Sequence, residues 1–349
     1  MDLRYGLNPH QAARVIDRGP LNVLNGTPSF INVLDALTAW HLVREASAAL
    51  GAPVATSFKH VSPAGAATAG DVDSTMRSSW GLGRSTVGTL TSAYVRARDC
   101  DPKSSFGDMI AVSEPVDIEL AEFVRGVIAD GIIAPGFEPG AVEILARKKH
   151  RSFCVFEVDP RHEPPAWERR DVYGVVLEQE RDRQPITADS LRGLPDDAVA
   201  DGLLGMITLR HTASNSVTFV RDGMTIGVAA GQQSRVDSTR LAGEKAAVWW
   251  GRRDPAAREP AFAPKRPRQE RLNEQMQRAS HLPDAAPLDH VTMVSDGFLP
   301  FRDNVDVARE YGVRHIVEPG GSTRTPDVRA ACREHGITLV HTGIRLFRH

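Results

Sequence analysis

Residues 57–67 read SFKHVSPAGAA, and this stretch decides how the rest of the chain is interpreted. A short strand-like run enters the adjacent pair Lys59 and His60, and the turn-forming residues 62–65 follow at once. In an α/β fold, reactive polar groups commonly follow the carboxyl end of a strand. Neighbours in a continuous strand point to opposite faces, so both side chains serve one site only where the pleat breaks. Pro63 and Gly65 predict such a break.

The Lys59–His60 pair has the residue types that proton transfer requires. The lysine stays cationic while the histidine titrates near neutral pH. Taken alone, however, such a pair is more often an ordinary surface feature. The assignment therefore depends on the rest of the chain.

The composition indicates a cytoplasmic globular protein of about two domains. The 349 residues are 41% hydrophobic with a net charge of -2, which gives no overall basic field for nucleic acid. Three distant cysteines without a CxxC pair argue against a disulfide framework or structural zinc and fit a reducing compartment. No apolar run is long enough to span a membrane, and the N-terminus lacks the apolar core of a signal peptide. Basic clusters at 147–151 and 265–268 are typical of solvated faces, with a phosphorylated small molecule as the alternative ligand.

Strand-like and helix-like segments alternate along most of the chain, which predicts crossover units and mainly parallel sheets. We predict a first α/β unit at 1–157, a proline- and charge-rich connector at 158–202, and a second α/β unit at 203–349. Asn32 is the expected cap of a helix that runs to about residue 50. Expected strands lie at 54–58, 109–112, 131–134, 291–295, 314–318 and 337–341, with a hairpin at 216–229; expected helices lie at 85–99, 116–129, 141–147, 235–250, 303–311 and 326–335.

Three further stretches place polar groups at strand ends or turns. Residues 231–235, GQQSR, follow a strand and open a helix, where backbone N–H groups suit an anion or a polar heterocycle. Asn215 lies just before the expected hairpin, and residues 296–303, DGFLPFRD, follow another strand. Each has a structural alternative: a common strand-to-helix turn, a turn-forming asparagine, or aromatics that belong to the core.

Several well-known catalytic motifs are missing. The chain has no Walker loop, no HExxH, no GxSxG and no GxGxxG after a strand. P-loop, metal or nicotinamide chemistry therefore has little support, and no metal is expected. The residues alone predict a cytoplasmic α/β enzyme with polar loops at several strand ends.

Nine stretches, in order and from residue 3 to residue 349, resemble the AICAR transformylase family. They are LRYGLNPHQ, VLNGTPSFIN, SFKHVSPAGAA, KSSFGD, DGIIAPGFEP, SNSV, GQQSRVDSTRLAGEKA, FLPFRDNVD and HTGIRLFRH. The resemblance implies formyl transfer from 10-formyltetrahydrofolate to the 5-amino group of AICAR in de novo purine biosynthesis, giving formyl-AICAR and tetrahydrofolate. It also implies two cytidine-deaminase-like α/β/α units and a homodimer with sites at the interface.

The resemblance further implies roles for individual residues. The catalytic residues that it implies are Lys59, His60 and Asn215. In this assignment His60 takes a proton from the substrate amine, Lys59 acts on the folate side, and Asn215 holds the amine and the carboxamide. The implied nucleotide-binding residues are Arg4, Tyr5, Asn32, Gly107, Asp130, Lys149, Arg235, Phe298 and Arg345. The implied folate-side residues are Pro300, Phe301, Asp303 and Asn304. The amine is conjugated into an imidazole carboxamide and is a poor nucleophile, so it needs both a base and oxyanion stabilisation.

The chain departs from the family pattern in four places. The cyclohydrolase domain that usually precedes this region is absent, so a separate cyclohydrolase is expected to process the product. Residues 210–213 read RHTA where the family commonly has KYTQ, Lys103 replaces an apolar residue near the folate, and 251–290 is short. These departures leave two alternatives open: a formyltransferase for another amino-heterocycle nucleotide, and a non-catalytic nucleotide-binding paralogue.

Overall fold

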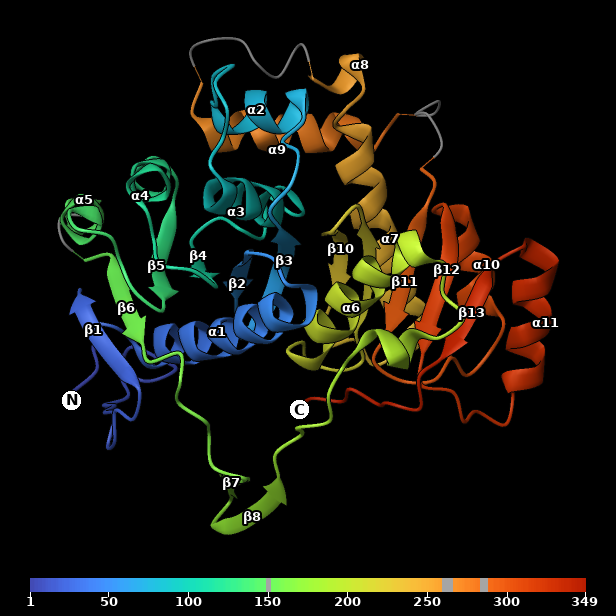
Figure 1. Cartoon of the computed structure of the whole chain (residues 1–349), viewed down its shortest axis with the longest axis horizontal. Helices are drawn as coiled ribbons and strands as arrows, with labels where there is room; N and C mark the ends of the chain where they lie inside the picture. Colours follow the sequence, from blue (N-terminus) through green and yellow to red (C-terminus); the bar gives the residue numbers. More distant parts are fainter. Residues whose placement is uncertain (149–151, 259–265, 283–287) are drawn as a thin grey trace.

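The computed structural model describes residues 1–148, 152–258, 266–282 and 288–349. At its centre is one 11-stranded sheet in the order β1-β6-β5-β4-β2-β3-β10-β9-β11-β12-β13, with helices on both faces (Figure 1). The predicted α/β class is confirmed. The predicted mainly parallel arrangement is wrong for the middle of the sheet, because all pairs from β4–β2 across to β9–β11 are antiparallel. Only the runs β4-β5-β6 and β11-β12-β13 are parallel.

The first half of the chain supplies β1 to β6. Its elements are β1 (Leu21–Asn25), α1 (Phe30–Leu50), β2 (Val54–Lys59), β3 (Ser62–Thr68), α2 (Ser74–Trp80), α3 (Thr89–Asp99), β4 (Asp108–Val112), α4 (Ile118–Arg125), β5 (Ala129–Ala134), α5 (Ala141–Ala146) and β6 (Cys154–Val158). The connecting segment holds β7 (Trp167–Val172), β8 (Val175–Glu180) and a short 3-10 helix at Ala188–Leu191.

The second half repeats the element order of the first. Its elements are α6 (Asp196–Arg210), β9 (Val217–Arg221), β10 (Met224–Ala229), α7 (Arg235–Gly251), α8 (Pro255–Arg258), α9 (Arg268–Ala279), β11 (Val291–Ser295), α10 (Asp303–Glu310), β12 (Val313–Glu318), α11 (Thr325–His335) and β13 (Thr338–His341). In each half a helix precedes an antiparallel hairpin, further helices follow (α2 and α3, or α7 to α9), and three parallel strands then alternate with two helices. The hairpins β2–β3 and β9–β10 lie next to each other at the centre.

Each face of the sheet has its own hydrophobic core. In β4, Met109 and Ala111 join the core beneath α1 and α6, whereas Ile110 and Val112 join the core beneath α3 and α7. Strict alternation of this kind is the consequence of the two-residue period of a strand. Because both faces are covered, the sheet strands are apolar or small along most of their length.

Helix α1 begins differently from the prediction. Its cap is Ser29, whose hydroxyl accepts from the backbone N–H of Asn32, and the Asn32 side chain accepts in return from the Ser29 backbone. This reciprocal capping box satisfies two of the orphan donors at the helix start. Asn32 is therefore the third residue of the helix and not its cap.

Two helices, α8 and α9, lie between residues 251 and 287, a segment rich in proline and arginine for which the sequence predicts no helix. Helix α9 packs against α7 and α2, with Leu272 buried beneath it. In the part of the chain that the structure describes, no helix is long and apolar enough to cross a membrane.

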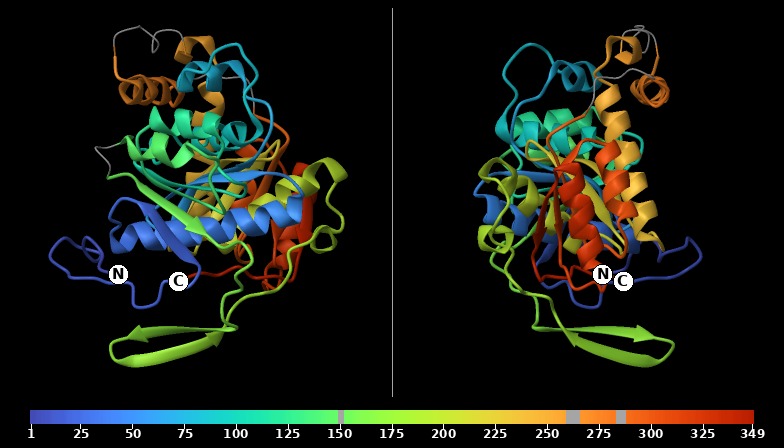
Figure 2. Two further views of the ribbon diagram at one scale, coloured as in Figure 1. Left: turned by 60° about the vertical axis from the view of Figure 1, so that its left-hand side comes forward. Right: turned by 90° about the vertical axis from the view of Figure 1, so that its right-hand side faces the viewer.

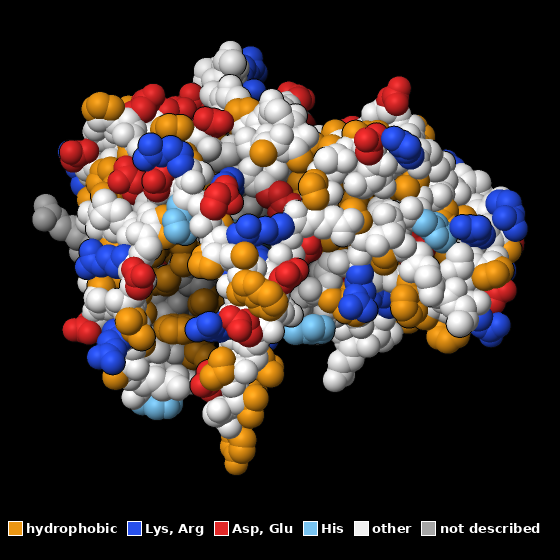
Figure 3. Space-filling view, turned by 60° about the horizontal axis from the view of Figure 1, so that its bottom comes forward, with side chains coloured by type: hydrophobic (Ala, Val, Ile, Leu, Met, Phe, Trp, Pro, Cys, Tyr) orange, Lys and Arg blue, Asp and Glu red, His pale blue; other side chains and the backbone are white. Residues whose placement is uncertain are grey.

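The connector forms a hairpin that stands clear of the body (Figure 2). Strands β7 and β8 pair from Trp167↔Glu180 to Val172↔Val175. Sequence reasoning missed both strands because charged residues obscure their alternation. Val176 and Leu177 are 63% and 54% exposed, and hydrophobic side chains run along the projection in Figure 3.

Candidate functional site

A cavity of about 450 Å³ opens beside the carboxyl end of β11. Its lining residues come from four separate segments of the second half: the turn before β9, the loop that leads into α7 together with the first residues of α7, the stretch from the loop after β11 to the start of α10, and the last residues of the chain. They are Asn215, Gln233, Ser234, Arg235, Val236, Phe298, Pro300, Phe301, Asp303, Asn304 and Phe347. Seven residues implied by the family resemblance are thus brought to one cavity.

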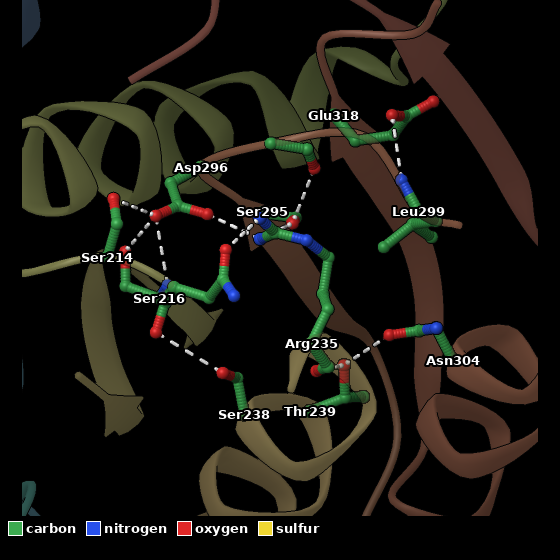
Figure 4. A network of polar contacts seen from close by, with 12 residues as sticks. Ser214, Ser216, Arg235, Ser238, Thr239, Ser295, Asp296, Leu299, Asn304 and Glu318 are labelled. Carbon is green, nitrogen blue, oxygen red and sulfur yellow. Dashed lines mark hydrogen bonds and ion pairs between the residues drawn. The ribbon is translucent and has the colours of Figure 1, made fainter. Parts of the chain in front are cut away.

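Asp296 is the centre of the polar network behind this cavity (Figure 4). Its side chain is fully buried, and Oδ2 accepts from the Ser214 hydroxyl at 2.6 Å, the Ser216 backbone N–H at 2.9 Å and the Ser216 hydroxyl at 3.0 Å. Its other oxygen forms an ion pair with Arg235. A buried carboxylate with four partners is well compensated for the loss of water.

Arg235 connects this network to Asn215. One guanidinium nitrogen bonds Asp296, and the other donates to Asn215 Oδ1 at 2.6 Å. The same guanidinium lies 5.9 Å from the ring centroid of Phe347, and Arg345 lies 4.8 Å from that ring. Phe347 therefore has two cationic side chains within cation–π distance at the cavity wall.

The loop after β11 presents aromatic side chains at the cavity. Phe298 and Phe301 are 43% and 54% exposed, so neither belongs to the core, which was the structural alternative for this stretch. The Leu299 backbone N–H between them donates to Glu318 Oε2 at 3.3 Å. Glu318 lies at the end of β12, and burial raises the pKa of its carboxyl.

Asn304 has a mainly structural setting. Its side chain is buried, accepts from the Thr239 hydroxyl at 3.2 Å and donates to Asp303 at 2.8 Å. The bond from Thr239 joins α7 to α10, whereas the bond to Asp303 lies within α10. Asn304 therefore supports the cavity wall more than it faces the cavity.

Lys59 and His60 lie in the first half, at the turn of the β2–β3 hairpin. His60 and Val61 have φ values of 54° and 58°, so the pleat breaks directly after Lys59, as the sequence predicts. The break lies at His60–Val61, however, and residues 62–68 form β3, not a turn. Gly65 is required by packing instead, because a Cβ there would lie 2.2 Å from the Ala97 carbonyl oxygen.

Asp35 of α1 holds this turn in place. Its Oδ1 accepts from the Val61 backbone N–H at 2.6 Å, which ties the left-handed turn to the helix. Burial raises the pKa of Asp35, with nearby His60 acting in the opposite direction. On the other side, the Lys59 ammonium donates to the Phe106 carbonyl oxygen at 2.5 Å.

The remaining described residues of the first half lie at two places, beside the start of β4 and at the start of α1. Gly107 has φ 76°, and a Cβ there would meet Asp130 Oδ1 at 3.8 Å, so the two are neighbours. Asn32 lies one turn before Asp35 on α1. At the start of α1, the Tyr5 carbonyl oxygen accepts from Phe30, and the Arg4 guanidinium lies 4.8 Å from the Tyr5 ring centroid. Lys149 lies outside the described residues.

The Lys59–His60 group and the cavity residues around Asn215 lie at the same end of the sheet's strands, but the structure does not bring them together. This end of the sheet holds the end of β2, the starts of β4, β5 and β9, and the end of β11. Strands β3 and β10 separate Lys59 from Asn215, which places the groups at least about 14 Å apart at ordinary strand spacing. Strands β3 and β10 share a single residue pair, Met224↔Ala67, which lies at the opposite end of the strands.

The residues that depart from the family pattern do not line the cavity. Arg210 and His211 both bond Glu45 of α1, with 3.0 Å between His211 Nε2 and Glu45 Oε2. The Ala213 carbonyl oxygen accepts from Gly231 at 2.7 Å. Lys103 is exposed in the turn before β4.

Three residues of this arrangement were missed by sequence reasoning. Asp296 and Phe347 lie inside stretches that drew attention for other residues, and Asp35 lies inside a helix. An acidic residue directly after an apolar strand was a usable signal for Asp296. Nothing in the helical pattern around Asp35 distinguishes it from a solvated position.

Comparisons with known proteins agree with these observations. Residues 1–245 match the family model described as the AICARFT/IMPCHase bienzyme. The bifunctional purine biosynthesis protein PurH of Roseobacter denitrificans is 35% identical over 99% of this chain and 59% of its own length. The corresponding protein of Cereibacter sphaeroides is 34% identical over the same shares. The chain thus spans about three fifths of the length of the curated relatives it matches.

Proposed function

Because the chain belongs to the AICARFT/IMPCHase bienzyme family, we propose that it transfers a formyl group from 10-formyltetrahydrofolate to the 5-amino group of AICAR. The observation that carries the proposal is the cavity. Asn215, Arg235 and Phe298 meet there with the folate-side residues, although they are far apart in the sequence. These are the transformylase residues implied by the resemblance, which favours this activity over the cyclohydrolase activity of the bienzyme.

The proposed reaction breaks one bond to carbon and forms another. The amine nitrogen of AICAR attacks the formyl carbon, and a tetrahedral intermediate forms with negative charge on the formyl oxygen. The bond to N10 of the folate then breaks, which releases tetrahydrofolate. His60 takes the proton lost by the amine, and Lys59 supplies a proton on the folate side.

The cavity side chains have chemistry that suits these substrates. Arg235 in the cavity wall, and Arg345 beside the lining residue Phe347, are cationic groups for the nucleotide phosphate. Phe298 offers an exposed ring for stacking on a flat heterocycle. Asn215 offers amide hydrogens to the carboxamide. In this proposal the two α/β halves are cytidine-deaminase-like units, and each carries its site residues at the same end of the sheet's strands.

We propose that the working form is a homodimer whose sites combine both groups. Within one chain β3 and β10 separate the Lys59 group from the Asn215 group, so one copy alone does not assemble the complete set. The β7–β8 hairpin also leaves Val176 and Leu177 exposed. A two-stranded hairpin is marginally stable by itself in water, which supports a second copy as its cover.

The test is a steady-state assay with purified protein, AICAR and 10-formyltetrahydrofolate, following release of tetrahydrofolate. We expect turnover in the ordinary enzyme range of about 1–10³ per second. Asn215→Ala should abolish most of it, whereas Asn273→Ala, on the exposed side of α9, should not. AICAR that binds in calorimetry without turnover would favour a non-catalytic paralogue. Absence of binding, with turnover of an analogue, would favour another amino-heterocycle.

A further inference from the structure

We propose that Asp296 is a positioning residue that fixes the orientation of the Asn215 amide, an inference that rests on the proposed function. Asp296 itself lies behind the cavity and is fully buried. Its two carboxylate oxygens bond the two segments that carry Asn215 and Arg235. It therefore acts on a ligand only through Asn215 and Arg235.

The first argument is the closed ring of bonds. Oδ1 of Asp296 pairs with Arg235, Arg235 donates to Asn215 Oδ1 at 2.6 Å, and the Ser216 backbone returns to Asp296 Oδ2 at 2.9 Å. Ser214 on the other side of Asn215 donates to the same oxygen at 2.6 Å. Both neighbours of Asn215 thus bond this carboxylate directly, and its side-chain oxygen is held through Arg235. Figure 4 shows Ser214, Ser216 and Arg235 around Asp296.

The second argument is that the Asp296 side chain is not needed to hold strand β11 in the sheet. Strand β11 is already held by its ladders to β9 and β12, and the Asp296 backbone N–H donates to the Ser216 carbonyl oxygen. Among the described residues, the Asp296 side chain bonds to Ser214, Ser216 and Arg235. Its carboxylate serves the segments that carry Asn215 and Arg235, not the strand itself.

The consequence concerns which end of the amide a ligand meets. With Oδ1 occupied by Arg235, Asn215 presents its N–H side to the cavity, where the one competing bond that the described residues offer is a weak one of 3.3 Å to the Gln233 carbonyl oxygen. Without the carboxylate, Arg235 loses its anchor and the amide is free to turn its oxygen toward the ligand. A donor suits a carboxamide oxygen, whereas an acceptor repels it.

The test is a double-mutant cycle of Asp296→Asn and Asn215→Ala, with kcat, KM and AICAR affinity measured for all four proteins. We expect Asp296→Asn alone to lower kcat on the order of 10²-fold, and to add less than about threefold in the Asn215→Ala background. Multiplicative effects, or an unchanged kcat for Asp296→Asn, would overturn the proposal. A purely structural role would give lost stability with additive effects.

A matched control and a milder variant keep the result interpretable. Asp99 is another fully buried carboxylate, paired with Arg252 at 2.8 Å and distant from the site, so Asp99→Asn should lose stability but keep kcat. If Asp296→Asn fails to fold, Ser214→Ala with Ser216→Ala removes two hydroxyl donors and keeps the ion pair. It should show the same non-additivity with Asn215→Ala, and additivity would count against the proposal.

One readout needs no substrate. Crystal structures of the wild type and Asp296→Asn should differ at the Arg235–Asn215 bond, which we expect to be lost in the variant. Its retention at 2.6 Å would overturn the proposal even if the protein proved inactive with AICAR. Failure of the proposed function would instead appear as an inactive wild type.

Discussion

Asp35 and Asp201 occupy the same position in the two halves: each is the sixth residue of its helix and accepts from the turn of the following hairpin. Asp35 bonds Val61 at 2.6 Å, and Asp201 bonds Gly223 at 2.7 Å. The first turn carries His60, whereas the second is Asp222–Gly223 and lies at the opposite edge of the sheet. The same device thus supports a candidate catalytic residue in one half and a plain turn in the other.

Replacement of His60 by alanine should lower kcat by about 10²- to 10⁴-fold, because a general base contributes an effect of this size. AICAR affinity measured by calorimetry should change little, since the proposed role is proton transfer. His281→Ala, at the exposed end of α9, is the control and should leave both values unchanged. Near-normal turnover of the His60 variant would remove it from this role.

Mixing two inactive variants tests whether sites combine residues from two copies. Equal amounts of His60→Ala and Asn215→Ala, after subunit exchange, should recover about a quarter of wild-type activity, because half the dimers are mixed and each has one intact site. Mixing His60→Ala with Lys59→Ala should recover none. Exchange is verified by native mass spectrometry, and exchanged but inactive mixtures would place each site within one chain.

Arg252→Met should destabilise the fold by about 3–5 kcal/mol, since buried Asp99 loses its nearest cation and keeps only the Trp80 indole N–H and the more distant Arg253, at 3.9 Å. Both side chains are fully buried, and the pair joins α3 of the first half to the end of α7 in the second. Arg240→Met removes an exposed pair with Asp237 and should change the free energy of unfolding by less than about 0.5 kcal/mol. Urea unfolding measures both, and equal midpoints would contradict the assignment.

Asp201 should make stability fall as pH rises. Burial raises its pKa to about 6, so the folded state retains a proton that the unfolded state has lost. The stabilising contribution of protonated Asp201 to the free energy of unfolding is complete below its unfolded-state pKa of 3.8, and it is lost as pH rises through about 6. Asp201→Asn should gain stability relative to the wild type across this interval. A constant difference in urea midpoints from pH 4 to pH 7 would show that Asp201 titrates normally.

Sequence reasoning predicted most strands of the parallel runs, because their apolar segments alternate with helical ones and end in clear turn signals. It failed at β3, where Pro63 and Gly65 indicate a turn when read locally. Packing against α3 decided that segment, and packing is invisible to a local pattern. The hairpin β7–β8 was missed because its strands carry many charges.

The residues of the candidate site were likewise predicted only in part. The resemblance supplied the cavity residues Asn215, Arg235 and Phe298, which lie in or directly after the connections that flank β9, β10 and β11. Asp296 and Asp35 escaped because their importance lies in contacts between distant segments. Residue type and spacing carry no record of such contacts.

The pairing of β3 with β10 also has a consequence for synthesis on the ribosome. Met224 follows Thr68 by about 150 residues, so at about 5–20 residues per second β3 waits roughly 8–30 s for its neighbour. During that time the nascent chain exposes an open strand edge, the usual template for aggregation. Pro63 lies on that strand and has no N–H to offer an intruding chain. The residues that looked like a turn are thus suited to protecting an unfinished protein.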